Sequence, residues 1–220
     1  MSGVLYIVST PIGNLKDITL RAIEVLKEVA LIAAEDTRHT RILTGHYGIT
    51  TPLTSYFQYN KVRKADTLIR VLKEGKDIAL VSDAGTPGIS DPGCVIIRKA
   101  LEEDIEVVPI PGPSAFLAAL SASGMRTDRF VFEGFLSNKE SKRRRRLKEL
   151  KTEGRTVIVY ESPHRILKTL KDIEDVLGDI HIVVARELTK KFEEIKRVKT
   201  SEAIEHFTKK GPRGEFIILF

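Results

Sequence analysis

Residues 77–93 read Asp-Ile-Ala-Leu-Val-Ser-Asp-Ala-Gly-Thr-Pro-Gly-Ile-Ser-Asp-Pro-Gly, an apolar run followed by a loop with three glycines and two prolines. Glycine allows positive φ angles and close backbone approach, proline fixes φ, and Asp83 and Asp91 can accept hydrogen bonds from a ligand. A plain strand-to-helix connection is the alternative, but such connections usually take roughly 2–6 residues and this loop has about ten. Open α/β sheets bind ligands in loops that follow strands. We therefore expect residues 82–93 to hold a ligand.

Apolar runs and amphipathic stretches alternate on both sides of this loop. Such a series of strands and helices predicts a mainly parallel sheet in the first half of the chain. Asp17 is placed to cap the first helix. The expected strands are 4–8, 31–34, 77–80 and 106–110, and the expected helices are 18–29, one starting near 39, one around 65–72, 94–103 and 115–123.

The pattern changes after Arg129. The expected strands there are 130–136, with a kink at Gly134, then 156–160, 182–185 and 215–220, and the expected helices are 139–151 and 166–177. The last strand is so apolar that we expect it to be paired inside a sheet rather than at its edge. The Pro/Gly-rich stretch near 111–114 divides the sequence, so we predict two α/β domains, residues 1–113 and 114–220.

Charge is distributed unevenly between these halves. Residues 1–113 have a net charge of −1, and residues 114–220 have a net charge of +7. Residues 139–151 alone hold eight cations and two anions, including the run Arg143, Arg144, Arg145 and Arg146. Successive residues of a helix point about 100° apart, so some of these arginines face solvent in any packing. A solvated face is one interpretation, and we favour a polyanionic partner.

Several chemistries are disfavoured by what the sequence lacks. The first strand is not followed by Gly-x-Gly-x-x-Gly, there is no Walker A lysine, and the five histidines show no metal-ligand spacing, so we expect no metal site. Ser114 does not sit in a nucleophile elbow and is better explained as a helix cap. Cys94 is the single cysteine, which excludes an intramolecular disulfide, and we expect it to be a small hydrophobe early in a helix. With no apolar run near the roughly 20 residues of a membrane span, we expect a cytoplasmic protein.

The remaining site type is a ligand held by loop backbone and small side chains. S-adenosylmethionine suits such a site, because its adenine needs an apolar slot while its ribose and amino-acid ends need carboxylates and backbone groups. Methyl transfer then depends on alignment and on removal of a proton. The residue types permit methylation without singling it out.

Six motifs in one order give a resemblance that single motifs do not. They are Ser9–Leu15, Glu35–Arg38, Ser82–Gly93, Pro111–Ala115, Phe132–Phe135 and Tyr160–Arg165. Together they resemble the tetrapyrrole methylase superfamily, and within it the bacterial methyltransferases of the ribose 2′-oxygen of a cytidine in small-subunit (16S) ribosomal RNA. The resemblance implies two α/β domains with S-adenosylmethionine in the cleft between them, a homodimer, and ribosomal RNA or an assembled small subunit as partner.

The resemblance also implies particular site residues. Those placed at the cofactor are Thr10, Pro11, Asp83, Gly85, Thr86, Ser114, Ala115, Tyr160 and Glu161. A ribose hydroxyl is a poor acid, so a base near it or a cation that stabilises the alkoxide would assist transfer. Our hypothesis for the base is Glu35 or Asp36. For the cation it is Arg38 or Arg186.

Two alternatives stay open at this point. One is a methylase of the same superfamily that acts on a corrinoid or porphyrin precursor, and the other is a non-catalytic RNA-binding module.

Many members of the resembled family carry a basic extension after the second domain, whereas this sequence ends at Phe220. We therefore expect that either the helix of Arg143–Arg146 contributes more of the RNA binding or a partner supplies it.

Overall fold

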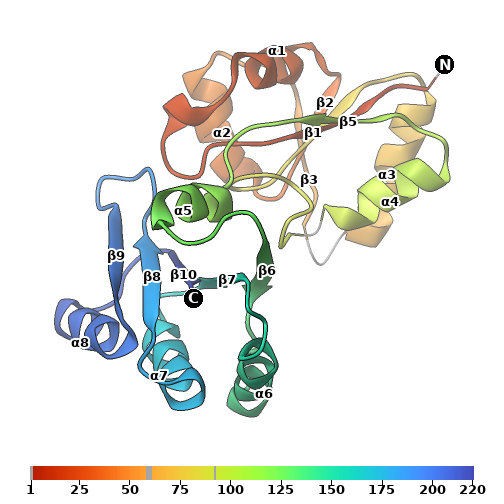
Figure 1. The fold of residues 1–220 in the computed structure, drawn as a ribbon. Helices are drawn as coiled ribbons and strands as arrows, with labels where there is room; N and C mark the ends of the chain where they lie inside the picture. Colours follow the sequence, from red (N-terminus) through yellow and green to blue (C-terminus); the bar gives the residue numbers. More distant parts are fainter. Residues whose placement is uncertain (1, 58–60, 92) are drawn as a thin grey trace. The chain divides into compact units, whose positions relative to one another are not determined.

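The computed structural model describes residues 2–57, 61–91 and 93–220. Met1 lies outside the described residues, and so does Pro92, which belongs to the predicted ligand loop 82–93. The chain divides into two compact units, Met1–Ser114 and Ala115–Phe220. The division falls one residue after the boundary that the sequence suggests. Both units combine strands and helices, which confirms the expected α/β class (Figure 1).

The first unit is built on a five-stranded sheet of order β3-β2-β4-β1-β5, in which every neighbouring pair is parallel. This confirms the predicted parallel sheet. Strand β3 is not expected from the sequence, because it is short and half-buried. The elements are β1 Leu5–Val8, the 3-10 helix η1 Leu15–Asp17, α1 Leu20–Glu28, β2 Leu31–Ala34, α2 Thr37–His46, β3 Leu53–Ser55, α3 Lys61–Lys73, β4 Ile78–Val81, α4 Cys94–Glu102 and β5 Val107–Ile110.

Helices cover both faces of this sheet. Leu5 and Leu80 point to a core that contains residues of α3 and α4, and Val8 and Val81 point to a core that contains residues of α1 and α2. Successive side chains of a strand point to opposite faces, so burial on both faces requires the continuous apolar runs seen in the sequence. The helical connections leave the carboxyl ends of the strands at one edge of the sheet.

Two local predictions are wrong. Asp17 lies in η1, and α1 is capped by Thr19, whose Oγ1 accepts a hydrogen bond from the backbone N–H of Ala22 at 3.2 Å. Cys94 does begin a helix, but its side chain is exposed. The reason is helical periodicity, because the buried side of α4 is set by Ile96 and Ala100.

The second unit contains a mixed sheet of order β6-β7-β10-β8-β9. Strand β10 is antiparallel to both of its neighbours, which confirms that the last strand lies inside a sheet. The register between β6 and β7 shifts at Phe132/Gly134, the site of the expected kink. The elements are α5 Ala115–Ser123, β6 Phe130–Phe135, α6 Glu140–Leu150, β7 Thr156–Glu161, α7 Ile166–Leu177, β8 His181–Arg186, β9 Glu194–Lys199, α8 Thr200–Lys210 and β10 Phe216–Leu219.

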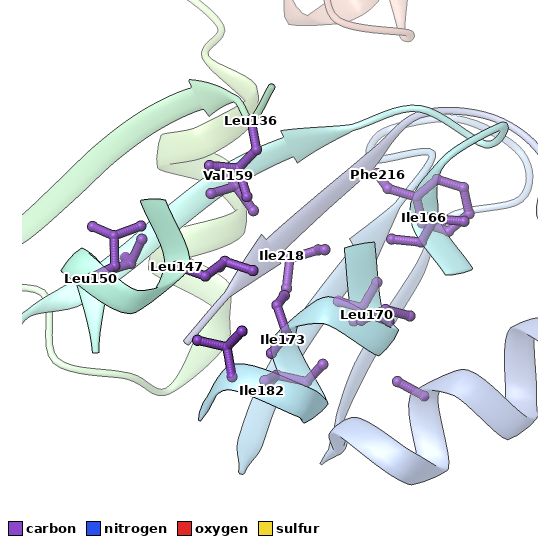
Figure 2. Packing of buried hydrophobic residues seen from close by; sticks show 14 of the residues in the cluster. Leu136, Leu147, Leu150, Val159, Ile166, Leu170, Ile173, Ile182, Phe216 and Ile218 are labelled. Atoms are coloured by element: carbon purple, nitrogen blue, oxygen red, sulfur yellow. The ribbon is translucent and has the colours of Figure 1, made fainter. Parts of the chain in front are cut away.

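One apolar core joins this sheet to α6, α7 and α8 (Figure 2). Its strand residues include Val159 and Ile218, and its helix residues include Leu147 and Leu170. Helix α5 packs against β7 and β10. Strand β9 and helix α8 are absent from the sequence prediction. The strand was missed because it reads Glu-Ile-Lys-Arg-Val-Lys, in which charged residues outnumber apolar ones.

Candidate functional site

The predicted loops of the first unit meet at the carboxyl edge of its sheet. The Thr10 hydroxyl after β1 donates to the backbone oxygen of Ser82 after β4, at 3.1 Å. The backbone N–H of Asp36 after β2 donates to Oδ1 of Asp83 at 3.0 Å. Three segments far apart in sequence therefore form one cluster of hydroxyls and carboxylates. The motif Tyr160–Arg165 belongs to the second unit.

Backbone pairing fixes the start of the glycine loop. Thr10 and Gly85 exchange two backbone hydrogen bonds, of 2.9 Å and 3.0 Å. Gly85 has a φ of +80°, a conformation that side chains rarely adopt. The hydroxyls of Ser9 and Thr86 share a hydrogen bond of 2.8 Å. The structure thus brings Thr10, Gly85 and Thr86, three predicted cofactor residues, into direct contact.

Asp91 holds the far end of the same loop. Its Oδ1 accepts hydrogen bonds from the backbone N–H groups of Gly88 and Gly93, both at 2.7 Å. Burial raises the pKa of this carboxyl despite these bonds. A Cβ at position 93 would lie 2.8 Å from the nitrogen of Gly88, so only glycine fits there. The loop therefore has a defined shape that depends on one carboxylate and one close backbone approach.

The two candidate bases have opposite electrostatic surroundings. Burial, and next the neighbouring Asp83 carboxylate, raise the pKa of Glu35. Asp36 instead caps α2 and accepts hydrogen bonds from the backbone and guanidinium of Arg38, which lower its pKa to about 2. A carboxylate with a low pKa is a poor proton acceptor. Of the two, Glu35 is by its raised pKa the better proton acceptor, and its catalytic role stays a prediction.

Arg38 is less suited to the role of catalytic cation than the sequence suggests. Its side chain is 85% exposed, and its guanidinium is already paired with Asp36 at 2.9 Å. An exposed, neutralised cation contributes little to stabilising a developing negative charge. Its more direct role is at the start of α2.

A cavity of about 210 Å³ opens beside this cluster. Its wall combines apolar side chains with hydroxyls and one carboxylate, which is the chemistry needed by a ligand with an apolar ring and polar substituents. Sequence reasoning missed its lining from α2, although the helix begins directly after the Glu35–Arg38 motif. The lining residues are Thr10, Pro11, Gly13, Leu15, His39, Thr40, Ile42, Leu43, Ser82 and Asp83.

In the second unit, Tyr160 lies among aromatic rings. Its ring centroid is 5.0 Å from that of Phe132 and 5.6 Å from that of Phe135, both in edge-to-face arrangements. Burial raises the pKa of Tyr160 to about 12, so its hydroxyl stays protonated. Its predicted contact with a cofactor stays a prediction.

Glu161 has a structural role that the sequence did not reveal. Its carboxylate accepts hydrogen bonds from the Arg165 guanidinium, from the backbone of Ser162 and from the Thr169 hydroxyl at 2.6 Å. These four bonds fill the acceptor positions of a carboxylate. A cofactor contact through this side chain would displace one of them.

Arg186, the other candidate cation, is buried at the end of β8. Its Nε donates to the backbone oxygen of Arg213 at 2.6 Å, and its guanidinium lies 3.5 Å from Glu194. Ser114 and Ala115 are half-buried on either side of the division between the units. The catalytic role of Arg186 and the cofactor contacts of Ser114 and Ala115 stay predictions.

The four arginines of the run do not share one exposed face, and their binding to RNA stays a prediction. Arg143 is 4% exposed, and its Nε donates to Asp172 at 2.6 Å. Arg144 is paired with Asp172 as well. Arg146 forms a two-pronged pair with Glu133. Arg145 is the exception, with a side chain that is 75% exposed.

Among the described residues, no helix has both the length and the apolar character that crossing a bilayer requires. Across residues 2–57, 61–91 and 93–220, no group of three His, Cys, Asp or Glu side chains is arranged to hold a metal ion.

Comparison with known proteins gives both a family and near relatives. A family model described as Tetrapyrrole (Corrin/Porphyrin) Methylases matches residues 4–204. A Synechocystis protein named Ribosomal RNA small subunit methyltransferase I is 53% identical over 99% of this chain and 78% of its own length. The Thermotoga maritima protein of that name is 49% identical over 99% of this chain and 97% of its own length.

Solved structures share the fold at lower identity. A diphthine synthase aligns over 99% of this chain and 90% of its own, with a TM-score of 0.79 and 14% identity. A cobalt precorrin-4 methyltransferase aligns over 98% of this chain and 93% of its own, with a TM-score of 0.72 and 18% identity. These similarities show the fold alone.

Proposed function

Because this chain belongs to the tetrapyrrole (corrin/porphyrin) methylase family, we propose that it transfers a methyl group from S-adenosylmethionine to the ribose 2′-oxygen of a cytidine in small-subunit (16S) ribosomal RNA. The observation that carries the proposal is the similarity, over nearly the full chain, to two ribosomal RNA small-subunit methyltransferases. The alternative of a corrinoid or porphyrin precursor as acceptor has weaker support, because the cobalamin-related structure shares only the fold.

The loop cluster of the first unit fits the methyl donor. Carboxylates of Glu35 and Asp83 suit a ligand that carries an ammonium and a sulfonium charge, and the hydroxyls of Ser9 and Thr86 suit its ribose. When bound, S-adenosylmethionine supplies an electrophilic methyl group. The cavity is smaller than the roughly 300–1,000 Å³ of a complete small-molecule site, so we assign it to part of a ligand.

Glu35 is the residue that we propose to remove the proton of the acceptor hydroxyl. A general base works best when its pKa lies near the working pH. Burial and the Asp83 carboxylate move the pKa of Glu35 upward, in that direction. The backbone N–H of Asp83 lies 3.5 Å from Glu35 Oε2, which ties the carboxylate to the glycine loop. Thus the base and the donor loop would move as one structure.

We also propose that the chain acts as a homodimer in the bacterial cytoplasm. The family resemblance supports the dimer, and the proposed ribosomal substrate supports the location. Light scattering at several protein concentrations tests the first proposal, with a single monomer mass as the contrary result.

The test of function uses small subunits from cells that lack this protein. Purified protein and S-adenosylmethionine are added to the subunits and, in parallel, to naked ribosomal RNA and to a tetrapyrrole precursor. Mass spectrometry of the digested RNA should show one new ribose-methylated cytidine. A methylated tetrapyrrole with unmodified RNA would favour the alternative acceptor, and RNA binding without affinity for S-adenosylmethionine would favour a non-catalytic RNA-binding protein.

A further inference from the structure

Helix α6 has one side turned to the protein and one side turned to solvent. Arg143, Leu147 and Leu150 are buried, with the spacing of one helical face. Lys142, Arg145 and Lys148 are exposed. Three residues advance a helix by about 300°, so residues spaced by three lie within a sector of about 120°. The three cations therefore form one stripe on the solvent side of α6.

The arginines on either side of this stripe are held in ion pairs, whereas the cations of the stripe are not. Arg144 is bonded to Asp175 at 2.7 Å, and Arg146 is bonded to Glu133 at 2.6 Å. Within the described part of the chain, Lys142 and Lys148 form no ion pair, and Arg145 approaches an acid only at 3.9 Å. The stripe thus carries positive charge that is not held in close ion pairs within the described residues.

Acidic residues near the stripe do not neutralise it. Glu149 is the acid on this side of α6, and its Oε2 is bonded to Arg146 at 2.8 Å. Its Oε1 lies 3.9 Å from Arg145, so this single carboxylate faces two arginines and leaves Lys142 and Lys148 without an acidic partner among the described residues.

The start of α6 is tied to the predicted donor-binding end of β7. Strands β6 and β7 are parallel, and Phe135 pairs with Tyr160, so both strands end at the same edge. Arg165 connects that edge to the segment that precedes α6, because it binds both Glu161 and the backbone oxygen of Leu136 at 3.1 Å. From there the stripe runs along α6 for about 9 Å, the rise of six helical residues.

We propose that Lys142, Arg145 and Lys148 form a phosphate-binding stripe that holds the RNA strand. This inference rests on the proposed function, since it takes the substrate to be RNA. Three cations with free charge on one exposed face suit a flexible chain of phosphates better than a compact anion. Arg143, Arg144 and Arg146 hold the helix in place and do not bind RNA.

The expected effect follows from counterion release. For single strands, the slope of log K against log salt is about −0.7 per phosphate contact, so loss of three contacts reduces its magnitude by about 2. At physiological salt the same relation gives an affinity loss on the order of 50-fold. Because these side chains point to solvent, their replacement leaves the core contacts of α6 in place.

The test measures binding of a labelled single-stranded RNA oligonucleotide at several salt concentrations. The variant replaces Lys142, Arg145 and Lys148 by Gln, and the control replaces three exposed cations of the first unit, Lys16, Arg21 and Lys27, by Gln. Only the first variant should show a salt slope of log K that is smaller in magnitude by about 2. Both variants should keep their affinity for S-adenosylmethionine in calorimetry. An unchanged slope in the first variant, or an equal loss in the control, would overturn the proposal.

Further experiments distinguish a failure of this inference from a failure of the proposed function. If the triple variant of Lys142, Arg145 and Lys148 is unstable, Arg145→Gln alone should still reduce the magnitude of the slope by about 0.7. Labelled polyglutamate binding to the wild type with the same salt dependence, and losing affinity equally in the variant, would point to an acidic protein partner and refute an RNA surface. Failure of the proposed function would appear differently, as a wild-type protein that methylates no small subunit.

Discussion

The buried pair between Arg143 and Asp172 gives the sharpest test of how the second unit is stabilised. The two side chains are 5% and 6% exposed, and the guanidinium lies 2.5 Å from Oδ2 of Asp172. Arg143 also donates to the backbone oxygens of Ser137 and Asn138. Its charge is therefore neutralised by one carboxylate, which Arg144 shares. Replacing Asp172 by Asn leaves a buried guanidinium without a full counter-charge.

The expected magnitude depends on whether one partner or both are replaced. Removal of one partner of a buried ion pair costs about 3–5 kcal/mol, because the other charge stays buried. Replacement of both partners by apolar side chains of similar volume is often neutral. We therefore expect Asp172→Asn to lower the free energy of unfolding by about 3–5 kcal/mol, and Arg143→Met combined with Asp172→Leu to recover most of that loss.

Urea unfolding of the wild type, Asp172→Asn, the single variants Arg143→Met and Asp172→Leu, and the double variant measures the difference. If the two units unfold in separate transitions, hydrogen exchange of β7 and β10 reports the second unit by itself. A loss below about 1 kcal/mol for Asp172→Asn would refute the reasoning, since that is the range of an exposed pair. So would a double variant as unstable as the sum of its single variants.

The remaining predictions concern the first unit. Glu35→Gln should reduce methyl transfer by about 10²–10⁴-fold at saturating S-adenosylmethionine, as measured by single turnover. Because the base acts when ionised, the rate should fall as pH drops through its pKa. Asp83→Asn removes a negative charge beside Glu35 and should move this acidic limb to lower pH in a pH–rate profile, and an unmoved limb would contradict the assignment. Gly93→Ala drives a Cβ against Gly88 and should weaken donor binding in calorimetry about tenfold or more, whereas Gly45→Ala, with nothing within 4 Å, should leave it unchanged.

The parallel sheet of the first unit could be predicted because its strands are buried on both faces. Runs such as Ile78–Val81 are apolar throughout, and the helices between them show a clear period. Strands β3 and β9 could not be found in this way. Residues 53–55 are too few to show a period, and β9 lies at the edge of its sheet, where charged side chains meet water.

The clustering of the loops of the first unit could be predicted from the sequence, whereas the ion-pair partners of the charged residues could not. The motifs Glu35–Arg38 and 82–93 each follow a strand, and parallel strands place such loops at one edge. The role of each arginine in 143–146 depends on acids that arrive from elsewhere in the chain, namely Glu133, Asp172 and Asp175. No local pattern states which arginine these acids will meet.

Strand β10 is the only strand that bridges the two halves of its sheet, since β7 and β8 pair with it and not with each other. During synthesis, β6, β7, β8 and β9 emerge as two separate ribbons, and each keeps an open inner edge until residues 216–219 leave the ribosome. The first unit has all of its strands by residue 110 and can close earlier. Nascent chains stalled before residue 216 should therefore resist protease in their first half and be cleaved in their second.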